Sequence, residues 1–183
     1  MYDLETIFFE LSKEIIDVLD HKRKYSSLYH FIKRDPKPQD IGIVMMSIGQ
    51  QIGLCYKRTN GEELLRIGQA IQPVFLEALK NSILHGPQKG VFAGLFVGEQ
   101  GACYGFKDFG DYFKNTNVKR SWESKTLIRS TNGKQPSYID GGYGFGDEMI
   151  YEYSDRIYVD CKQGVLYCFQ AKKRLFEIAP IPD

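Results

Sequence analysis

The spacing of apolar residues changes near Pro87, and this change constrains the fold more than any other feature of the chain. Before Pro87, apolar residues recur every three or four positions, which is the spacing of amphipathic helices. After it, short apolar runs are separated by glycine-containing turns, as in β-hairpins. Helices and strands arranged in this way bury their apolar faces against each other. We therefore predict an α+β fold, a two-layer sandwich of a mixed or antiparallel sheet covered by helices on one face.

Three helices are expected before this change. The first runs from about Leu4 to Leu19. A second follows the breaker Asp35 to Pro38, and the third extends from about Glu62 to His85, where Pro73 should kink or split it. The apolar positions expected to share the inner face of the second helix are Ile41, Val44, Met45, Ile48, Ile52 and Cys55. Those expected in the third are Leu64, Leu65, Ile67, Ile71, Val74, Phe75, Ala78 and Leu79.

Two hairpins are expected after the change. Val91 to Val97 and Ala102 to Lys107 form the first pair, and Arg156 to Asp160 and Val165 to Gln170 form the second. No repeat or Gly/Ser linker divides the chain. We expect a helical N-terminal extension over residues 1–35 and one domain over residues 36–183.

Charge and cysteine pattern limit the partners and the compartment. Lys and Arg number 24 and Asp and Glu 23, so the net charge of +1 creates no field that would gather nucleic acid or an anionic membrane. Neither is expected as a partner. The cysteines form no C-x-x-C pair, which indicates reduced core thiols in a cytosolic protein. With no secretory signal pattern and no apolar run near the roughly 20 residues that span a bilayer, we expect a cytoplasmic location. These cysteines are Cys55, Cys103, Cys161 and Cys168.

Three polar side chains repeat every four residues in the third expected helix. Glu77, Asn81 and His85 therefore share one face. Carboxylate and carboxamide oxygens at this spacing could hold Mg²⁺, which prefers oxygen ligands and bridges to substrate phosphates. A solvent-exposed polar stripe explains the same spacing.

Two glycine motifs follow. Asp108 ends an expected strand and Gly110 follows it in a turn. The segment 140–146 contains Gly142 and Gly144 and precedes a helical pattern. Glycines there would let the backbone approach a phosphate at a helix N-terminus. A loop that binds no nucleotide accounts for the glycines equally well.

In this order, the helix motif LEALKNSILHG beginning at Leu76, then Asp108-Phe109-Gly110 and Gly142-Tyr143-Gly144 resemble the GHKL (Bergerat-fold, histidine-kinase-like) ATP-binding family. The resemblance is closest to its anti-sigma-factor serine kinase branch and covers roughly residues 39–172. It implies that Asn81 helps to bind Mg²⁺ and that Glu77 is the candidate general base. Asp108 would accept a hydrogen bond from the adenine amino group, and Gly110 would allow adenine to approach closely.

The resemblance further implies that Gly142 and Gly144 line the ATP phosphates, with Gly144-Phe145-Gly146 as an alternative register, while residues 111–140 form a lid. Two positions depart from the family pattern. Tyr112 stands where a second glycine is usual, and Val165 stands where a threonine is usual. Both departures bear on turnover more than on nucleotide binding.

Three functions are therefore compatible with the sequence. The first is a magnesium-dependent ATP-binding domain that acts as a protein serine/threonine kinase or ATPase on a regulatory protein partner. The second is a degenerate module that binds a nucleotide or a protein without phosphoryl transfer. In the third, the motifs are coincidental in an unrelated α+β domain. The sequence leaves the oligomeric state open, and a homodimer is compatible with it.

Overall fold

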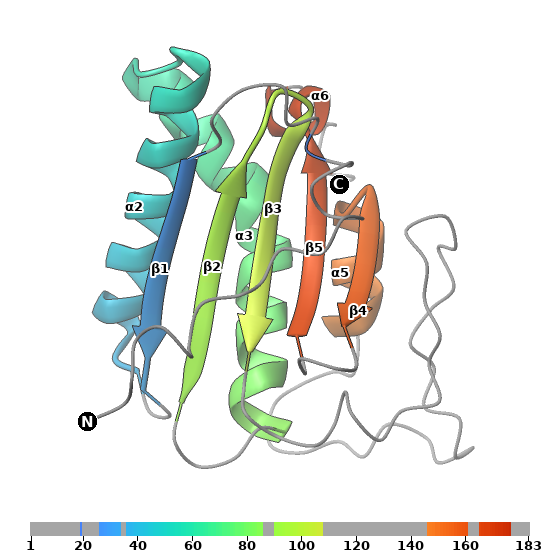
Figure 1. The fold of residues 1–183 in the computed structure, drawn as a ribbon. Coiled ribbons are helices and arrows are strands. Elements are labelled where there is room, and N and C mark those ends of the chain that lie inside the picture. Colours follow the sequence, from blue (N-terminus) through green and yellow to red (C-terminus); the bar gives the residue numbers. More distant parts are fainter. Residues whose placement is uncertain are drawn as a thin grey trace, which may run out of the picture.

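The computed structural model describes residues 19, 26–33, 36–85, 90–107, 146–160 and 165–176. In this part of the chain, five strands form one sheet in the order β1-β2-β3-β5-β4, and each neighbouring pair is antiparallel. Helices lie against this sheet (Figure 1). The elements are β1 (Ser26–Ile32), α2 (Pro38–Tyr56), α3 (Gly61–His85), β2 (Val91–Val97), β3 (Gly101–Lys107), α5 (Gly146–Tyr153), β4 (Arg156–Asp160), β5 (Val165–Ala171) and α6 (Lys172–Phe176).

The main core lies between the sheet and the helices. α2, α3 and α5 cover the same face of the sheet in Figure 1. Alternate strand residues point toward them, because successive side chains of a strand face opposite sides. On α3, Phe75 packs against Tyr104 and Phe106 of β3, with ring centroids 6.4 Å and 5.2 Å apart. These contacts confirm the predicted α+β sandwich with an antiparallel sheet.

The opposite face of the sheet also carries buried residues. Phe96 and Tyr167 have no exposed surface, and Leu19 packs in the same cluster. Leu19 is the one described residue of the helix expected from Leu4 to Leu19. The other members of this second cluster are Cys103, Val165 and Phe169.

The structure corrects four sequence-based expectations. Residues 26–32, expected within the helical extension 1–35, form the edge strand β1 and pair with β2. Of the two effects expected of Pro73, a kink or a split, the split is wrong, because α3 continues through Pro73 from Gly61 to His85. Cys55 and Leu65 lie on outer helix surfaces and are exposed, because the apolar stripes of α2 and α3 are wider than the faces that reach the sheet.

The helix ends follow from local side-chain chemistry. The Asn60 Oδ1 atom accepts a hydrogen bond of 2.9 Å from the Glu63 backbone amide and so caps α3. α2 ends where Lys57 adopts a left-handed conformation with φ of 56°, while the Arg58 amide donates to the Gly53 carbonyl at 2.8 Å. These caps set where α3 begins and therefore how its later residues align with the sheet.

Candidate functional site

The C-terminal half of α3 lies at the end of the sandwich where β3 ends. Ala70 of α3 contacts Gln170, which pairs with Ala102 near the start of β3. Phe75 then contacts Phe106 near the end of β3, so α3 and β3 run in the same direction. Asn81 is six residues further along α3, or about 9 Å at 1.5 Å per residue. β3 ends one residue, about 3 Å, after Phe106, so Asn81 lies roughly one helical turn beyond the end of β3.

α5 begins toward the same end of the sandwich. Its last residue, Tyr153, accepts a hydrogen bond from Gln170, so the helix ends near the start of β3. Gly146, the first residue of α5, lies seven residues earlier, about 10 Å away along the helix axis. The end of β3, the C-terminal half of α3 and the beginning of α5 thus point to one end of the molecule, the lower end in Figure 1.

Two of the six expected site residues lie in this described region. Glu77 and Asn81 are one helical turn apart on α3, and both are partly buried. The Glu77 side chain is 18% exposed, and its Oε1 atom lies 2.5 Å from the Lys80 ammonium. The four other expected site residues, Asp108, Gly110, Gly142 and Gly144, lie outside the described residues, as does the expected lid over residues 111–140.

The chain path relates the undescribed motifs to this end. Asp108 directly follows Lys107, the last residue of β3, and Gly144 precedes the first residue of α5 by two positions. Both motifs are therefore tethered to elements that end or begin near the level of Asn81. The described segments next to the motifs therefore share one end of the sandwich, although Asn81 and Gly144 are 63 residues apart in sequence.

The oxygen donors of α3 fit a magnesium ion that is shared with a phosphate. Among the described residues, no three side chains of His, Cys, Asp and Glu gather into a group that could hold a metal ion. Mg²⁺ bound with a nucleotide takes only one or two protein ligands, and phosphates and water supply the others. The Glu77 carboxylate and the Asn81 carboxamide, on one face and partly accessible, have this chemistry.

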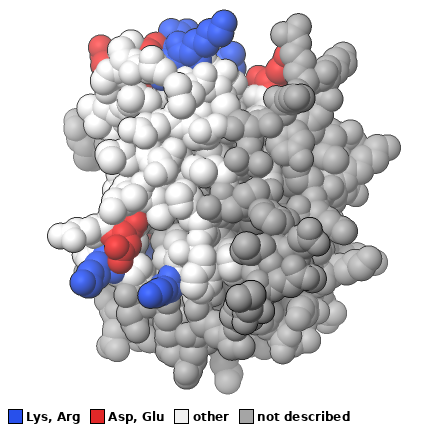
Figure 2. Space-filling view, turned by 60° about the vertical axis from the view of Figure 1, so that its left-hand side comes forward, with Lys and Arg blue, Asp and Glu red and all other residues white. Residues whose placement is uncertain are grey.

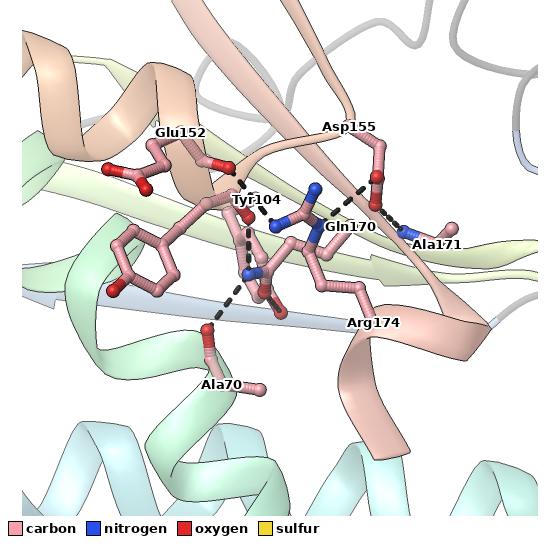
Figure 3. A network of polar contacts seen from close by, with 8 residues as sticks. Ala70, Tyr104, Glu152, Asp155, Gln170, Ala171 and Arg174 are labelled. Carbon is pink, nitrogen blue, oxygen red and sulfur yellow. Dashed lines mark hydrogen bonds and ion pairs between the residues drawn. The ribbon is translucent and has the colours of Figure 1, made fainter. Parts of the chain in front are cut away.

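A buried polar network connects the two helices of this site (Figure 3). The Gln170 side chain has no exposed surface. Its Nε2 atom donates hydrogen bonds of 2.8 Å to the carbonyls of Ala70 in α3 and Tyr153 in α5. Its Oε1 atom accepts a hydrogen bond of 2.9 Å from the Tyr104 hydroxyl. Gln170 therefore joins the helix that carries Asn81 to the helix that follows Gly144.

The end of α5 explains why one of these carbonyls takes a side-chain donor. Tyr153 is the last residue of α5, so its carbonyl has no intrahelical partner. On α3, Pro73 has no amide hydrogen, so the carbonyl without an intrahelical donor is that of Gln69, the residue before Ala70. Burial raises the pKa of Tyr104 well above its usual value, so its hydroxyl keeps the proton that it donates to Gln170.

Asp155 holds the turn after α5 against β5 and α6. One carboxylate oxygen accepts a hydrogen bond of 2.7 Å from the Ala171 amide, and the other lies 3.1 Å from Arg174 Nε. Arg174 also donates to the Glu152 carbonyl at 3.1 Å. Figure 3 shows these contacts beside those of Gln170. Neither the contacts of Gln170 nor those of Asp155 were predicted from the sequence, although Gln170 is a lone polar residue at an inward position of an apolar strand.

No model of a known protein family matches this chain, and no curated protein matches it at a significant level. In the described part of the chain, each helix is too short or too polar to span a bilayer. The candidate site therefore rests on its own chemistry: two oxygen donors on α3, at the end of the sandwich where β3 ends and α5 begins.

Proposed function

We propose that this chain is a cytoplasmic, magnesium-dependent ATP-binding domain that acts as a protein serine/threonine kinase or ATPase, resembling the anti-sigma-factor kinases. One observation carries the proposal. The C-terminal half of α3, the end of β3 and the start of α5 share one end of the sandwich, and each of these described segments contains or adjoins one of the three motifs, which supports the proposal. The substrate of a kinase of this kind is a hydroxyl of a regulatory protein partner.

In this proposal each motif residue has a defined task. Asn81 contributes its carboxamide oxygen to Mg²⁺, and the Glu77 carboxylate accepts the proton of the attacking hydroxyl or water. Asp108 accepts a hydrogen bond from the adenine amino group, and Gly110 leaves room for the ring. Phosphoryl transfer depends mainly on positioning and charge neutralisation, which a magnesium ion supplies.

Backbone amides are the second source of neutralisation in the proposal. Gly142 and Gly144 precede α5, and helix N-termini favour anions because their first amides have no intrahelical partner. Lys80 is the nearest described cation, since it contacts Glu77. In the proposal Lys80 turns to a phosphate when ATP binds, which frees the Glu77 carboxylate to accept a proton.

A second candidate function, nucleotide or protein binding without phosphoryl transfer, is favoured by Val165. This residue stands where the family has a threonine, and it is fully buried in the second apolar cluster. Its side chain lies on the face of the sheet opposite α3, and its neighbour Leu166 packs into the main core. Val165 thus supplies neither a hydroxyl nor any other group to the side on which Glu77 and Asn81 lie.

Calorimetric titration of ATP with Mg²⁺ into the purified protein tests nucleotide binding. We expect saturable, magnesium-dependent binding that Asn81→Ala weakens by about tenfold or more, because a lost charge-assisted ligand contact is worth roughly 1.5–3 kcal/mol. Gln72→Ala is the matched control, because Gln72 is an exposed amide on the opposite side of α3. Absence of binding to the folded protein, or equal losses in both variants, would contradict the proposed site.

Release of ADP separates the two candidate functions. We expect Glu77→Gln to retain ATP binding but to lose turnover, because the amide cannot accept the proton. Turnover by the parent that Glu77→Gln leaves intact would refute the role of the base. Binding without turnover in the parent, with and without candidate protein partners, would support the second function.

A further inference from the structure

The outer face of α2 is apolar although it is exposed. Ile43, Met46 and Leu54 are 59%, 62% and 63% exposed, whereas a surface helix usually presents polar side chains outward. The opposite side of the same helix is packed into the core through residues such as Ile48 and Ile52. α2 is therefore apolar on both sides, a pattern typical of a helix covered on both sides.

Charge is confined to the two ends of this face. The 16 residues from Ile41 to Tyr56 include no Asp, Glu, Lys or Arg. Asp40 lies at the start of the helix and Lys57 directly after its end, and both are exposed. Figure 2 shows the molecule with the α2 side turned forward. The described part of this surface is broadly uncharged, and charged side chains lie toward its upper and lower ends.

We propose that the outer face of α2 binds the same face of a second copy of this chain, with the two helices antiparallel. In a two-fold arrangement, residues that face each other have numbers with a constant sum. An axis between Ile48 and Gly49 brings Asp40 opposite Lys57 of the second copy. The same axis brings Ile43 opposite Leu54 of the second copy.

This register pairs like with like along one stripe of the helix. Each Asp40 carboxylate meets a lysine ammonium, and each Ile43 meets a Leu54. Ser47 lies opposite Gln50, so the centre pairs polar side chains with polar side chains. Asp40, Ile43, Ser47, Gln50 and Leu54 are spaced by three or four residues and follow one stripe of the helix. Antiparallel helices also bring the negative end of one macrodipole to the positive end of the other.

The size of the face predicts a reversible dimer. α2 has 19 residues, which makes it about 28 Å long. One helix face of this length is smaller than the roughly 800 Å² per partner of a standard stable interface. We therefore expect a weak dimer, whose fraction rises with protein concentration. It is independent of the nucleotide site, because none of the residues involved belongs to α3, β3 or α5.

Sedimentation velocity over a wide concentration range tests the proposal. Reducing agent is present throughout, because Cys55 is exposed on α2 and could otherwise link two chains. We expect a monomer–dimer equilibrium that Ile43→Glu weakens by about tenfold or more, since it places carboxylates against apolar side chains. Leu65→Glu is the matched control: Leu65 is 63% exposed, as Leu54 is, but lies on α3 outside this face.

Charge reversal tests the register itself. Asp40→Lys and Lys57→Glu should each weaken the dimer, and the double variant should restore it, because the pair is rebuilt with opposite polarity. Circular dichroism checks the helix in each variant, since Asp40 also accepts a hydrogen bond from the Lys37 amide at 3.1 Å. A monomer at every concentration would overturn the proposal and leave the face to a different protein. A dimer insensitive to Ile43→Glu, or folded reversal variants without restoration, would also overturn it.

Discussion

The side-chain amide of Gln170 donates a hydrogen bond of 2.8 Å to the backbone carbonyl of Ala70, which is 100 residues earlier in the chain. This contact ties the end of β5 to the middle of α3, and the second hydrogen of the same amide reaches the end of α5. Gln170 therefore sets the spacing between α3 and α5. The C-terminal half of α3 and the start of α5 point to the candidate nucleotide site.

Gln170→Leu should lower the free energy of unfolding by about 2–4 kcal/mol. The substitution removes the donor from two partly buried carbonyls and the acceptor from the buried Tyr104 hydroxyl. A fully buried unsatisfied group costs roughly 1–3 kcal/mol, and partial exposure of the carbonyls reduces their share. Urea unfolding monitored by circular dichroism measures the change.

Tyr104→Phe is the matched control for this network. It removes only the hydroxyl that donates to Gln170, so we expect a smaller loss of about 1–2 kcal/mol. The double variant should lose less unfolding free energy than the sum of the two single variants, because Gln170 and Tyr104 share one hydrogen bond. Fully additive losses would show that the network does not couple them.

Stability should fall as the pH falls below about 6.5 because of His30. Burial lowers the pKa of His30 from its usual value of 6.5, and its Nε2 atom has no hydrogen-bond partner among the described residues. The unfolded chain therefore takes up a proton before the folded chain does, so the contribution of His30 is present above pH 6.5 and is lost as the pH falls through the folded pKa.

His30→Gln should flatten this part of the stability profile, since glutamine does not titrate. Thermal unfolding between neutral pH and about pH 5 covers the range above the usual carboxylate pKa values, which lie near 4. An equal slope in the parent and in His30→Gln would assign the acid sensitivity to other groups.

Thiol reactivity should distinguish the described cysteines. Cys55 is exposed, whereas Cys103 and Cys168 are fully buried. Burial raises the pKa of Cys168 to about 12, although the nearby Ser154 acts in the opposite direction, and burial also raises the pKa of Cys103. The thiolate is the reactive form, so iodoacetamide at pH 8 should modify Cys55 and spare the other two until the protein unfolds.

Peptide mapping of the alkylated protein measures this order, with the urea-unfolded chain as the positive control. Modification of Cys168 in the folded protein at the rate of Cys55 would contradict its buried position.

The raised pKa of Cys168 also makes stability decline as the pH rises from about 9 toward 12, because the unfolded chain then loses protons that folded Cys168 retains.

Two glycines one turn apart in α2 should respond oppositely to alanine. A Cβ atom at Gly49 would meet no atom within 4 Å, so Gly49→Ala should raise stability by about 0.5–1 kcal/mol through helix propensity. A Cβ atom at Gly53 would lie 2.5 Å from the Arg58 carbonyl oxygen and 2.7 Å from Leu64, so Gly53→Ala should be destabilising. Denaturant midpoints of the two variants measure the difference, and equal shifts would contradict the close packing around Gly53.

The periodicity of the sequence by itself determined much of the fold. The extents of α2 and α3 and both hairpins follow the predicted ranges within a few residues, because apolar spacing reflects which local conformation can bury a face. The α+β class followed from the same pattern. The edge strand β1 was missed, since its sequence SSLYHFI lacks a clear alternation and its strand conformation comes from pairing with β2.

Only the tertiary structure decided which surfaces and polar groups lie together. Helical spacing placed Glu77 and Asn81 on one face, but their position at the end of β3 follows from the packing of Phe75 against Phe106. The partners of Gln170 are up to 100 residues away, and the outer apolar stripe of α2 could not be separated from its inner stripe in the sequence. Local spacing reports what a segment can bury, whereas long-range contacts determine what it does bury.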